Sequence, residues 1–224
     1  TTGLKQVKSG YLVATTRGTF QTHYLISTAG LYSDRVAVQG RVDPAMKIVP
    51  FRGEYWHLRP EKSHLVKNLI YPVPNPRFPF LGVHMTRLID GSIHAGPNAV
   101  LAFSREGYSW GQINPQDLFE TLAYPGFWKL ANKYLSEGLK EMYRSLIKSE
   151  FLRSVQELIP EIGSDDLVKG AAGVRAQALR SDGSLIDDFQ LLERENAIFV
   201  INAPSPAATA SLEIGKYIAA KIVS

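Results

Sequence analysis

A predicted β-hairpin constrains the fold of this chain more than any other feature of its sequence. Two short β-like runs, residues 81–85 and 92–95, flank the dipeptide Asp90-Gly91. The turn of such a hairpin needs a residue with positive φ, and glycine adopts that conformation without strain. The sequence therefore predicts two antiparallel strands at this point, held in a fixed register by the turn.

The hairpin also places a histidine inside each predicted strand. Because side chains alternate along a strand, His84 should share one face with Gly82 and Thr86. An imidazole among small and polar neighbours suits the wall of a ligand site. We interpret His94, in the second strand, as structural or peripheral.

The remaining pattern predicts strands at both ends of the chain. Residues 10–14 and 23–27 alternate as two antiparallel strands, and residues 28–34 read as a strand–glycine–helix transition. Residues 170–177 and 197–201 are candidates for buried strands. The free N–H groups of a helix that follows a glycine suit contact with a phosphate or a dinucleotide.

The middle of the chain is predicted to change from strands to helices. Residues 47–58 read as a long strand with a break at Arg52-Gly53, and residues 74–79 as a rigid, proline-rich loop. Helical spacing begins at Asn114-Pro115, a cap followed by a first-turn proline, and continues to residue 158 with a break at Pro125-Gly126.

Two segments near the C-terminus are rich in small residues, which let a large group pack closely. Residues 170–177 include a single arginine, Arg175, whose guanidinium suits bidentate capture of a carboxylate. Residues 202–211 lead into a last amphipathic helix, predicted over residues 207–222, with Pro206 in the first turn and Ser205 as its cap.

Composition excludes several classes of function. The 224 residues are 45% hydrophobic and 21% charged and contain no run of 18 apolar residues, so a transmembrane helix is not expected. The net charge of +4 is scattered, which argues against a nucleic-acid partner but permits small anionic substrates. The chain has no cysteine and its five histidines are far apart, so a metal site is not expected.

Residues 68–108 and 170–211 carry a family resemblance. The first segment contains Asn68-Leu-Ile-Tyr-Pro-Val-Pro-Asn-Pro, the predicted hairpin, and Val100-Leu-Ala-Phe-Ser-Arg-Glu-Gly-Tyr. With these motifs, the chain resembles the L-2-hydroxyglutarate dehydrogenase/oxidase family over nearly its whole length. These are flavoenzymes of the D-amino-acid-oxidase-like group.

The resemblance implies an α/β fold with α+β character. Residues 1–45 and 170–224 would form part of an FAD-binding domain, and residues 46–169 a substrate domain whose mixed sheet is covered by helices. The active site is expected where this sheet meets the flavin. The family's Gly-x-Gly-x-x-Gly fingerprint is absent. We therefore expect a C-terminal fragment that is inactive alone; a complete small protein of unrelated fold is the alternative.

The function implied by the resemblance is FAD-dependent oxidation of L-2-hydroxyglutarate, a small dicarboxylate, to 2-oxoglutarate. A flavin-dependent amino-acid or amine oxidase of the same fold and a non-catalytic binding domain are the alternatives. The electron acceptor stays open between oxygen, a quinone and a carrier protein. The expected location is cytoplasmic, with peripheral contact at the inner membrane as an option.

The resemblance also implies roles for individual residues. His84 is the candidate base for the substrate hydroxyl, and Arg175 the candidate clamp for the C1 carboxylate. The second carboxylate has three candidate partners that the sequence does not rank: Arg52, Tyr71 and Arg87. The expected cofactor contacts are Ala29, Gly30, Arg52, Gly173, Ser205, Pro206, Ala207, Ala208 and Thr209.

Overall fold

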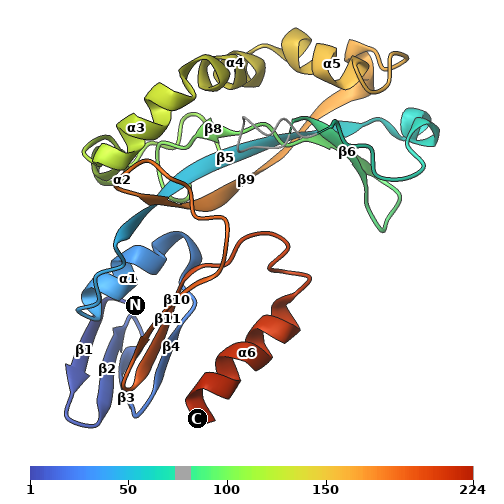
Figure 1. Cartoon of the computed structure of the whole chain (residues 1–224). Helices are drawn as coiled ribbons and strands as arrows, with labels where there is room; N and C mark the ends of the chain where they lie inside the picture. Colours follow the sequence, from blue (N-terminus) through green and yellow to red (C-terminus); the bar gives the residue numbers. More distant parts are fainter. Residues whose placement is uncertain (74–81, 224) are drawn as a thin grey trace. The chain divides into compact units, whose positions relative to one another are not determined.

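The computed structural model describes residues 1–73 and 82–223 and has the mixed α/β fold that the sequence predicts (Figure 1). The predicted proline-rich loop at residues 74–79 and the first residue of the predicted hairpin, Leu81, lie outside the described residues. The chain divides into two compact units. Unit 1 comprises Thr1–Val49, Tyr124–Phe127 and Ala176–Ser224, and unit 2 comprises Pro50–Ala123 and Trp128–Arg175.

Unit 1 begins with a three-stranded antiparallel meander of β1 (Gly3–Val7), β2 (Gly10–Thr15) and β3 (Gly18–Thr22). The predicted pairing of residues 10–14 with 23–27 is therefore wrong. Gly10 and Gly18 have φ of 126° and 130°, and these glycines let the chain reverse twice within the first 22 residues. β4 (Leu25–Ser27) instead joins a different sheet.

The second sheet of unit 1 has the order β10 (Gln190–Arg194), β11 (Ala197–Asn202) and β4, with β11 parallel to β4. A short 3-10 helix (Gly30–Tyr32) and α1 (Ser33–Gln39) follow β4. The Ser33 hydroxyl donates to the carbonyl oxygen of Ile201 over 2.8 Å, which ties the start of α1 to β11.

The last helix, α6 (Ser211–Val223), begins later than predicted. Ser205 is therefore not its cap, and Pro206 does not occupy its first turn. Residues 205–210 form turns instead, in which the Ala210 amide donates to the Pro206 carbonyl oxygen over 3.0 Å. Ile214 and Ile218 of α6 pack on Ile198 and Val200 of β11.

The sheet of unit 2 has the order β6 (His84–Arg87), β7 (Ile93–Gly96), β5 (Met46–Leu58) and β8 (Val100–Leu101), and β9 (Leu167–Arg180) also pairs with β5. β5 runs through Arg52 and Gly53 without the predicted break. The glycine does mark a close approach of the backbone, because a Cβ at Gly53 would lie 2.7 Å from Cβ of Pro97.

The predicted hairpin is present, but its loop is longer than the two residues Asp90-Gly91. β6 ends at Arg87 and β7 begins at Ile93, so five residues form the turn. Gly91 has φ of 84°, and Oδ1 of Asp90 accepts from the amide and the hydroxyl of Ser92 over 2.9 and 2.7 Å. The Asp90 side chain thus closes the loop locally.

Helices cover one face of this sheet (Figure 1). They are α2 (Pro115–Leu122), α3 (Pro125–Lys133), α4 (Leu135–Leu146) and α5 (Lys148–Gln156); the same unit also contains the 3-10 helices Pro60–Leu65 and Ser164–Asp166. Asn114 caps α2 as predicted, since its Oδ1 accepts from the amides of Gln116 and Asp117. Phe151 and Val155 of α5 pack on Met85 and Ile93 of the sheet. Within the described ranges, no helix is long and apolar enough to cross a membrane.

Candidate active site

The cross-strand register of unit 2 sorts the side chains of its sheet into two faces. Directly paired residues point to the same face. Ala95 pairs with both Met85 and Trp56, and these side chains lie in or against the core under the helices. His94 pairs with both Thr86 and His57, which places these residues on the other face.

His84 belongs to the face opposite the helices, as the predicted alternation with Thr86 requires. Its side chain is half-buried, and burial lowers the pKa of its imidazole below the usual range. Nδ1 lies 3.0 Å from the carbonyl oxygen of Gly82. Since a carbonyl oxygen only accepts, Nδ1 carries the proton and Nε2 keeps its lone pair. The Tyr71 ring stacks on the imidazole, with centroids 4.5 Å apart and planes 20° from parallel.

Aromatic and imidazole rings continue across this face of the sheet. The rings of His57 and His94 meet edge to face with centroids 4.2 Å apart, and Tyr55 lies tilted against His94 at 5.9 Å. Burial, and then the neighbouring His57, lower the pKa of His94. Burial raises the pKa of the half-buried Tyr55, so its hydroxyl stays protonated at neutral pH. The side chains of this row carry no negative charge.

Arg52 lies on the helix-covered face and is fully buried. Its Nε donates to Glu54 over 3.2 Å and its guanidinium stacks 4.4 Å from the centre of the Trp110 ring. Glu54 also accepts from the Ser145 hydroxyl, and its amide donates to Oδ1 of Asn98 over 2.7 Å. In the described part of the chain, Nη1 and Nη2 of Arg52 are buried without a hydrogen-bond partner.

The other predicted site residues of unit 2 are spread over the sheet. Arg87 pairs with the core residue Ile93, and its Nη1 donates to two backbone carbonyl oxygens, of Ser63 at 3.3 Å and of Val66 at 3.1 Å. Arg175 and Gly173 are exposed on β9. The structure therefore brings Tyr71 to His84, whereas Arg52 and Arg87 lie on the opposite face of the sheet, where Arg52 is buried and Arg87 is exposed.

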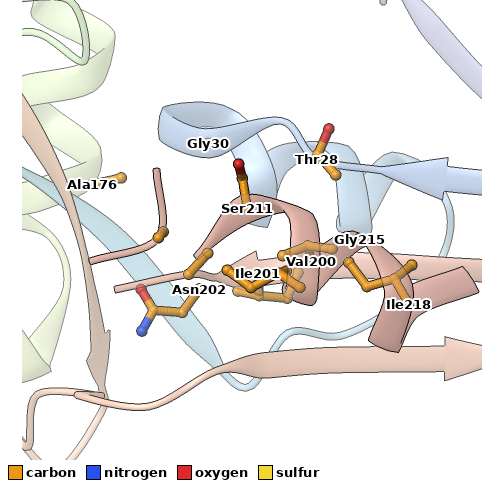
Figure 2. Close-up of a pocket in the computed structure, with 12 residues that line it drawn as sticks. Thr28, Gly30, Ala176, Val200, Ile201, Asn202, Ser211, Gly215 and Ile218 are labelled. Atoms are coloured by element: carbon orange, nitrogen blue, oxygen red, sulfur yellow. The ribbon is translucent and has the colours of Figure 1, made fainter. Parts of the chain in front are cut away.

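Unit 1 has a cavity of about 340 Å³ at the carboxyl ends of its two parallel strands (Figure 2). This edge of an α/β sheet is where ligands commonly bind. The lining is mostly apolar or small and comes from the end of β4, from β9, from β11 and from α6 with the residues before it. The lining residues are Thr28, Gly30, Ala176, Val200, Ile201, Asn202, Ala203, Ala207, Ser211, Ile214, Gly215 and Ile218.

Gly30 and Ala207 are the predicted cofactor contacts that line this cavity. Gly30 has φ of 54°, and a Cβ at this position or at Gly215 would meet no atom within 4 Å. The remaining predicted contacts of unit 1 are in the flanking loops and do not line it: Ala29, Ser205, Pro206, Ala208 and Thr209.

Sequence reasoning missed the contribution of β11 and of the first turns of α6 to the cavity, and it missed Tyr55. The alternation of β5 was the available signal for Tyr55, because it separates Tyr55 and His57 from Arg52. Using that signal required the pairing of β5 with β7, which depends on residues about 40 positions apart. No group of three or more potential metal ligands occurs among the residues described.

Comparisons with known proteins agree with this architecture. The family described as DAO, FAD dependent oxidoreductase, matches residues 1–221. The chain is 55% identical over 205 residues to L-2-hydroxyglutarate dehydrogenase of Indibacter alkaliphilus, covering 91% of this chain and 51% of that protein. It is 51% identical over 210 residues to the mitochondrial L-2-hydroxyglutarate dehydrogenase of Caenorhabditis elegans, covering 92% and 48%. The chain thus spans about half the length of these relatives.

A solved structure supports the fold. The FAD-bound L-alpha-glycerophosphate oxidase of Mycoplasma pneumoniae superposes with a TM-score of 0.65 at 19% identity, covering 95% of this chain and 47% of that one. At this level of identity the likeness concerns the fold alone.

Proposed function

The chain belongs to the FAD-dependent oxidoreductase family and is a homologue of the L-2-hydroxyglutarate dehydrogenases, and from this premise we propose that the complete protein oxidises L-2-hydroxyglutarate to 2-oxoglutarate. The observation that carries the proposal is the 55% identity to an L-2-hydroxyglutarate dehydrogenase over 91% of the chain. The electron acceptor and the cytoplasmic location stay predictions.

The cavity of unit 1 fits part of a flavin dinucleotide. Its volume of about 340 Å³ suits one portion of an extended cofactor, and its apolar walls suit a planar ring system. Gly30 and Gly215 leave room for a group to approach the backbone closely. We propose that this portion of FAD would be contacted by four residues that line the cavity: Gly30, Asn202, Ala207 and Ser211. When bound, FAD would accept the hydride that leaves C2 of the hydroxy acid.

His84 is our candidate for the base that takes the proton of the C2 hydroxyl. The hydrogen bond from Nδ1 to the Gly82 carbonyl oxygen fixes the tautomer, and the lowered pKa keeps the imidazole neutral at pH 7. Nε2 is therefore a competent acceptor. The stacked Tyr71 ring restricts the orientation of the imidazole, so the acceptor atom is held in one direction.

The C1 carboxylate needs a cation, and we assign this role to Arg175. It follows a run of small residues on β9 and its side chain is exposed. A guanidinium can grip a carboxylate with two parallel hydrogen bonds, which orients C2 as well as binding it. Among the three candidates for the second carboxylate, Tyr71 stacks on His84, whereas the buried Arg52 and the exposed Arg87 lie on the opposite face of the sheet.

Anaerobic reduction of the flavin in the complete protein tests the proposal. L-2-Hydroxyglutarate should bleach the oxidised flavin absorbance, and the D-enantiomer and L-glutamate should do so far more slowly. Faster reduction by L-glutamate would favour the amino-acid oxidase alternative. A complete protein without flavin absorbance would favour the non-catalytic binding domain.

A further inference from the structure

Tyr55, Gly96 and His84 form a row across three neighbouring strands of unit 2. His84 of β6 pairs directly with Gly96 of β7. On the other side of β7, a Cβ at Gly96 would lie 3.4 Å from both Cα and Cδ1 of Tyr55 on β5. The Tyr55 ring therefore leans over the position where Gly96 has no side chain. Adjacent strands are roughly 4.8 Å apart, so the backbones carrying the two rings are separated by roughly 10 Å.

Gly96 brings no side chain between the two rings, and the space that a Cβ would need is filled: that atom would lie 2.7 Å from the Glu54 carbonyl oxygen and 3.4 Å from Cδ1 of Tyr55. The φ of 130° at Gly96 belongs to the region that L side chains rarely adopt, so the backbone itself keeps this position a glycine. In this row His84 supplies a proton acceptor, and Tyr55, two strands away on the same face, supplies an aromatic ring with a hydroxyl.

The Tyr55 hydroxyl is free to serve a ligand. Across residues 1–73 and 82–223, no hydrogen bond of the protein uses this hydroxyl, and the hydroxyl is not one of the buried polar atoms that lack a partner. It is a donor that solvent or a ligand can reach. The neighbours described on this face from β5, β6 and β7 are imidazoles, Thr86 and the Tyr71 ring, none of which is a carboxylate; one carboxylate, that of Asp90 in the hairpin loop, acts on His94 and raises its pKa against the effect of burial.

We propose that the Tyr55 hydroxyl binds the C5 carboxylate of the substrate and thereby selects a dicarboxylate over a monocarboxylate 2-hydroxy acid. The inference rests on the proposed function, because it starts with the C2 hydroxyl at Nε2 of His84. From that point, a five-carbon chain that runs along the row carries its second acid group toward Tyr55. A hydroxyl that donates to a carboxylate forms a charge-assisted hydrogen bond without burying a second charge.

The test compares two substrates of equal chain length in the complete, FAD-loaded protein. Wild type, Tyr55→Phe and the control Tyr143→Phe are assayed for kcat/KM with L-2-hydroxyglutarate and with L-2-hydroxypentanoate, which lacks the C5 carboxylate. Tyr143 is an exposed tyrosine on α4. Tyr55→Phe should lower kcat/KM for the dicarboxylate roughly 10- to 100-fold, mostly through KM, and leave the value for the monocarboxylate nearly unchanged. Tyr143→Phe should match wild type with both.

The possible failures are distinguishable. If Tyr55→Phe lowers kcat/KM equally for both substrates, Tyr55 acts at the C1 or C2 end of the substrate and the inference is overturned. The inference is also overturned if kcat/KM falls for neither substrate. If wild type does not oxidise L-2-hydroxyglutarate, the proposed function itself fails. Because the hydroxyl bonds to nothing in the described fold, the thermal midpoint and flavin content of Tyr55→Phe should equal those of wild type. A large drop in either would show that the hydroxyl has a structural partner and would also overturn the inference.

Discussion

Replacing His84 by asparagine removes the proton acceptor Nε2 but keeps a donor for the hydrogen bond that Nδ1 makes. The asparagine amide can still donate to the Gly82 carbonyl oxygen, as Nδ1 of His84 does over 3.0 Å, but nothing replaces Nε2. Loss of a general base typically costs ~10²–10⁴-fold in rate, which corresponds to about 2.7–5.4 kcal/mol of transition-state stabilisation. The lost stacking on Tyr71 should cost about 0.5–1.5 kcal/mol and appear mainly in stability. We therefore expect kcat to fall by that factor with a much smaller change in KM.

The assay is the rate of anaerobic flavin reduction by L-2-hydroxyglutarate as a function of pH. Burial lowers the pKa of His84 below its ordinary value of 6.5, so wild-type activity should rise with pH through a point below 6.5 and be complete at neutral pH. That acidic limb should disappear in His84→Asn. The control is His64→Asn, since Nδ1 of the exposed His64 lies 2.9 Å from the Glu61 carbonyl oxygen in a comparable arrangement. Wild-type rates in His84→Asn, or an unchanged acidic limb, would refute the assignment of the base.

Protonation of His84 also makes the stability of the fold depend on pH, and the lowered pKa of this group fixes the direction of that dependence. The folded pKa of His84 is below the unfolded value, so the unfolded chain binds more protons between the two. The contribution of neutral His84 to stability is complete above pH 6.5 and is lost as the pH falls through the folded pKa. His84→Asn should therefore flatten the pH dependence of the free energy of unfolding below pH 6.5.

Three further substitutions test other parts of the structure. Gly215→Leu should fill the cavity of unit 1 and lower the FAD content of the purified complete protein, whereas Gly138→Leu, also at an open helical position, should not; equal FAD contents would contradict the cofactor assignment. Arg175→Lys should slow flavin reduction more than Arg180→Lys, because lysine lacks the bidentate fork; a slower Arg180→Lys would move the carboxylate clamp elsewhere. Arg52→Ala should lower the free energy of unfolding by roughly 3–5 kcal/mol in urea titrations, since it removes the ion-pair partner of the buried Glu54; a change under about 1 kcal/mol would show that this ion pair does not stabilise the fold.

Features with short-range causes could be predicted from the sequence by itself. The Asn114 cap follows from an amide side chain before a first-turn proline, and the hairpin follows from Asp90-Gly91 between two alternating runs. The face that His84 shares with Thr86 needs only the two-residue period of a strand. These features depend on backbone preferences and hydrogen bonds within a few residues, which the local sequence fully specifies.

Features with long-range causes were decided only by the tertiary structure. β4 pairs with β11, about 170 residues away, and this pairing forms the edge at which the cavity lies. The start of α6 at Ser211, instead of near Pro206, likewise contradicted its local sequence signals. The row of Tyr55, Gly96 and His84 exists only because β7 lies between β5 and β6 in one register, and a shift by one residue would turn Tyr55 under the helices. Register between distant strands is fixed by which side chains the core can bury together, and no local pattern contains that information.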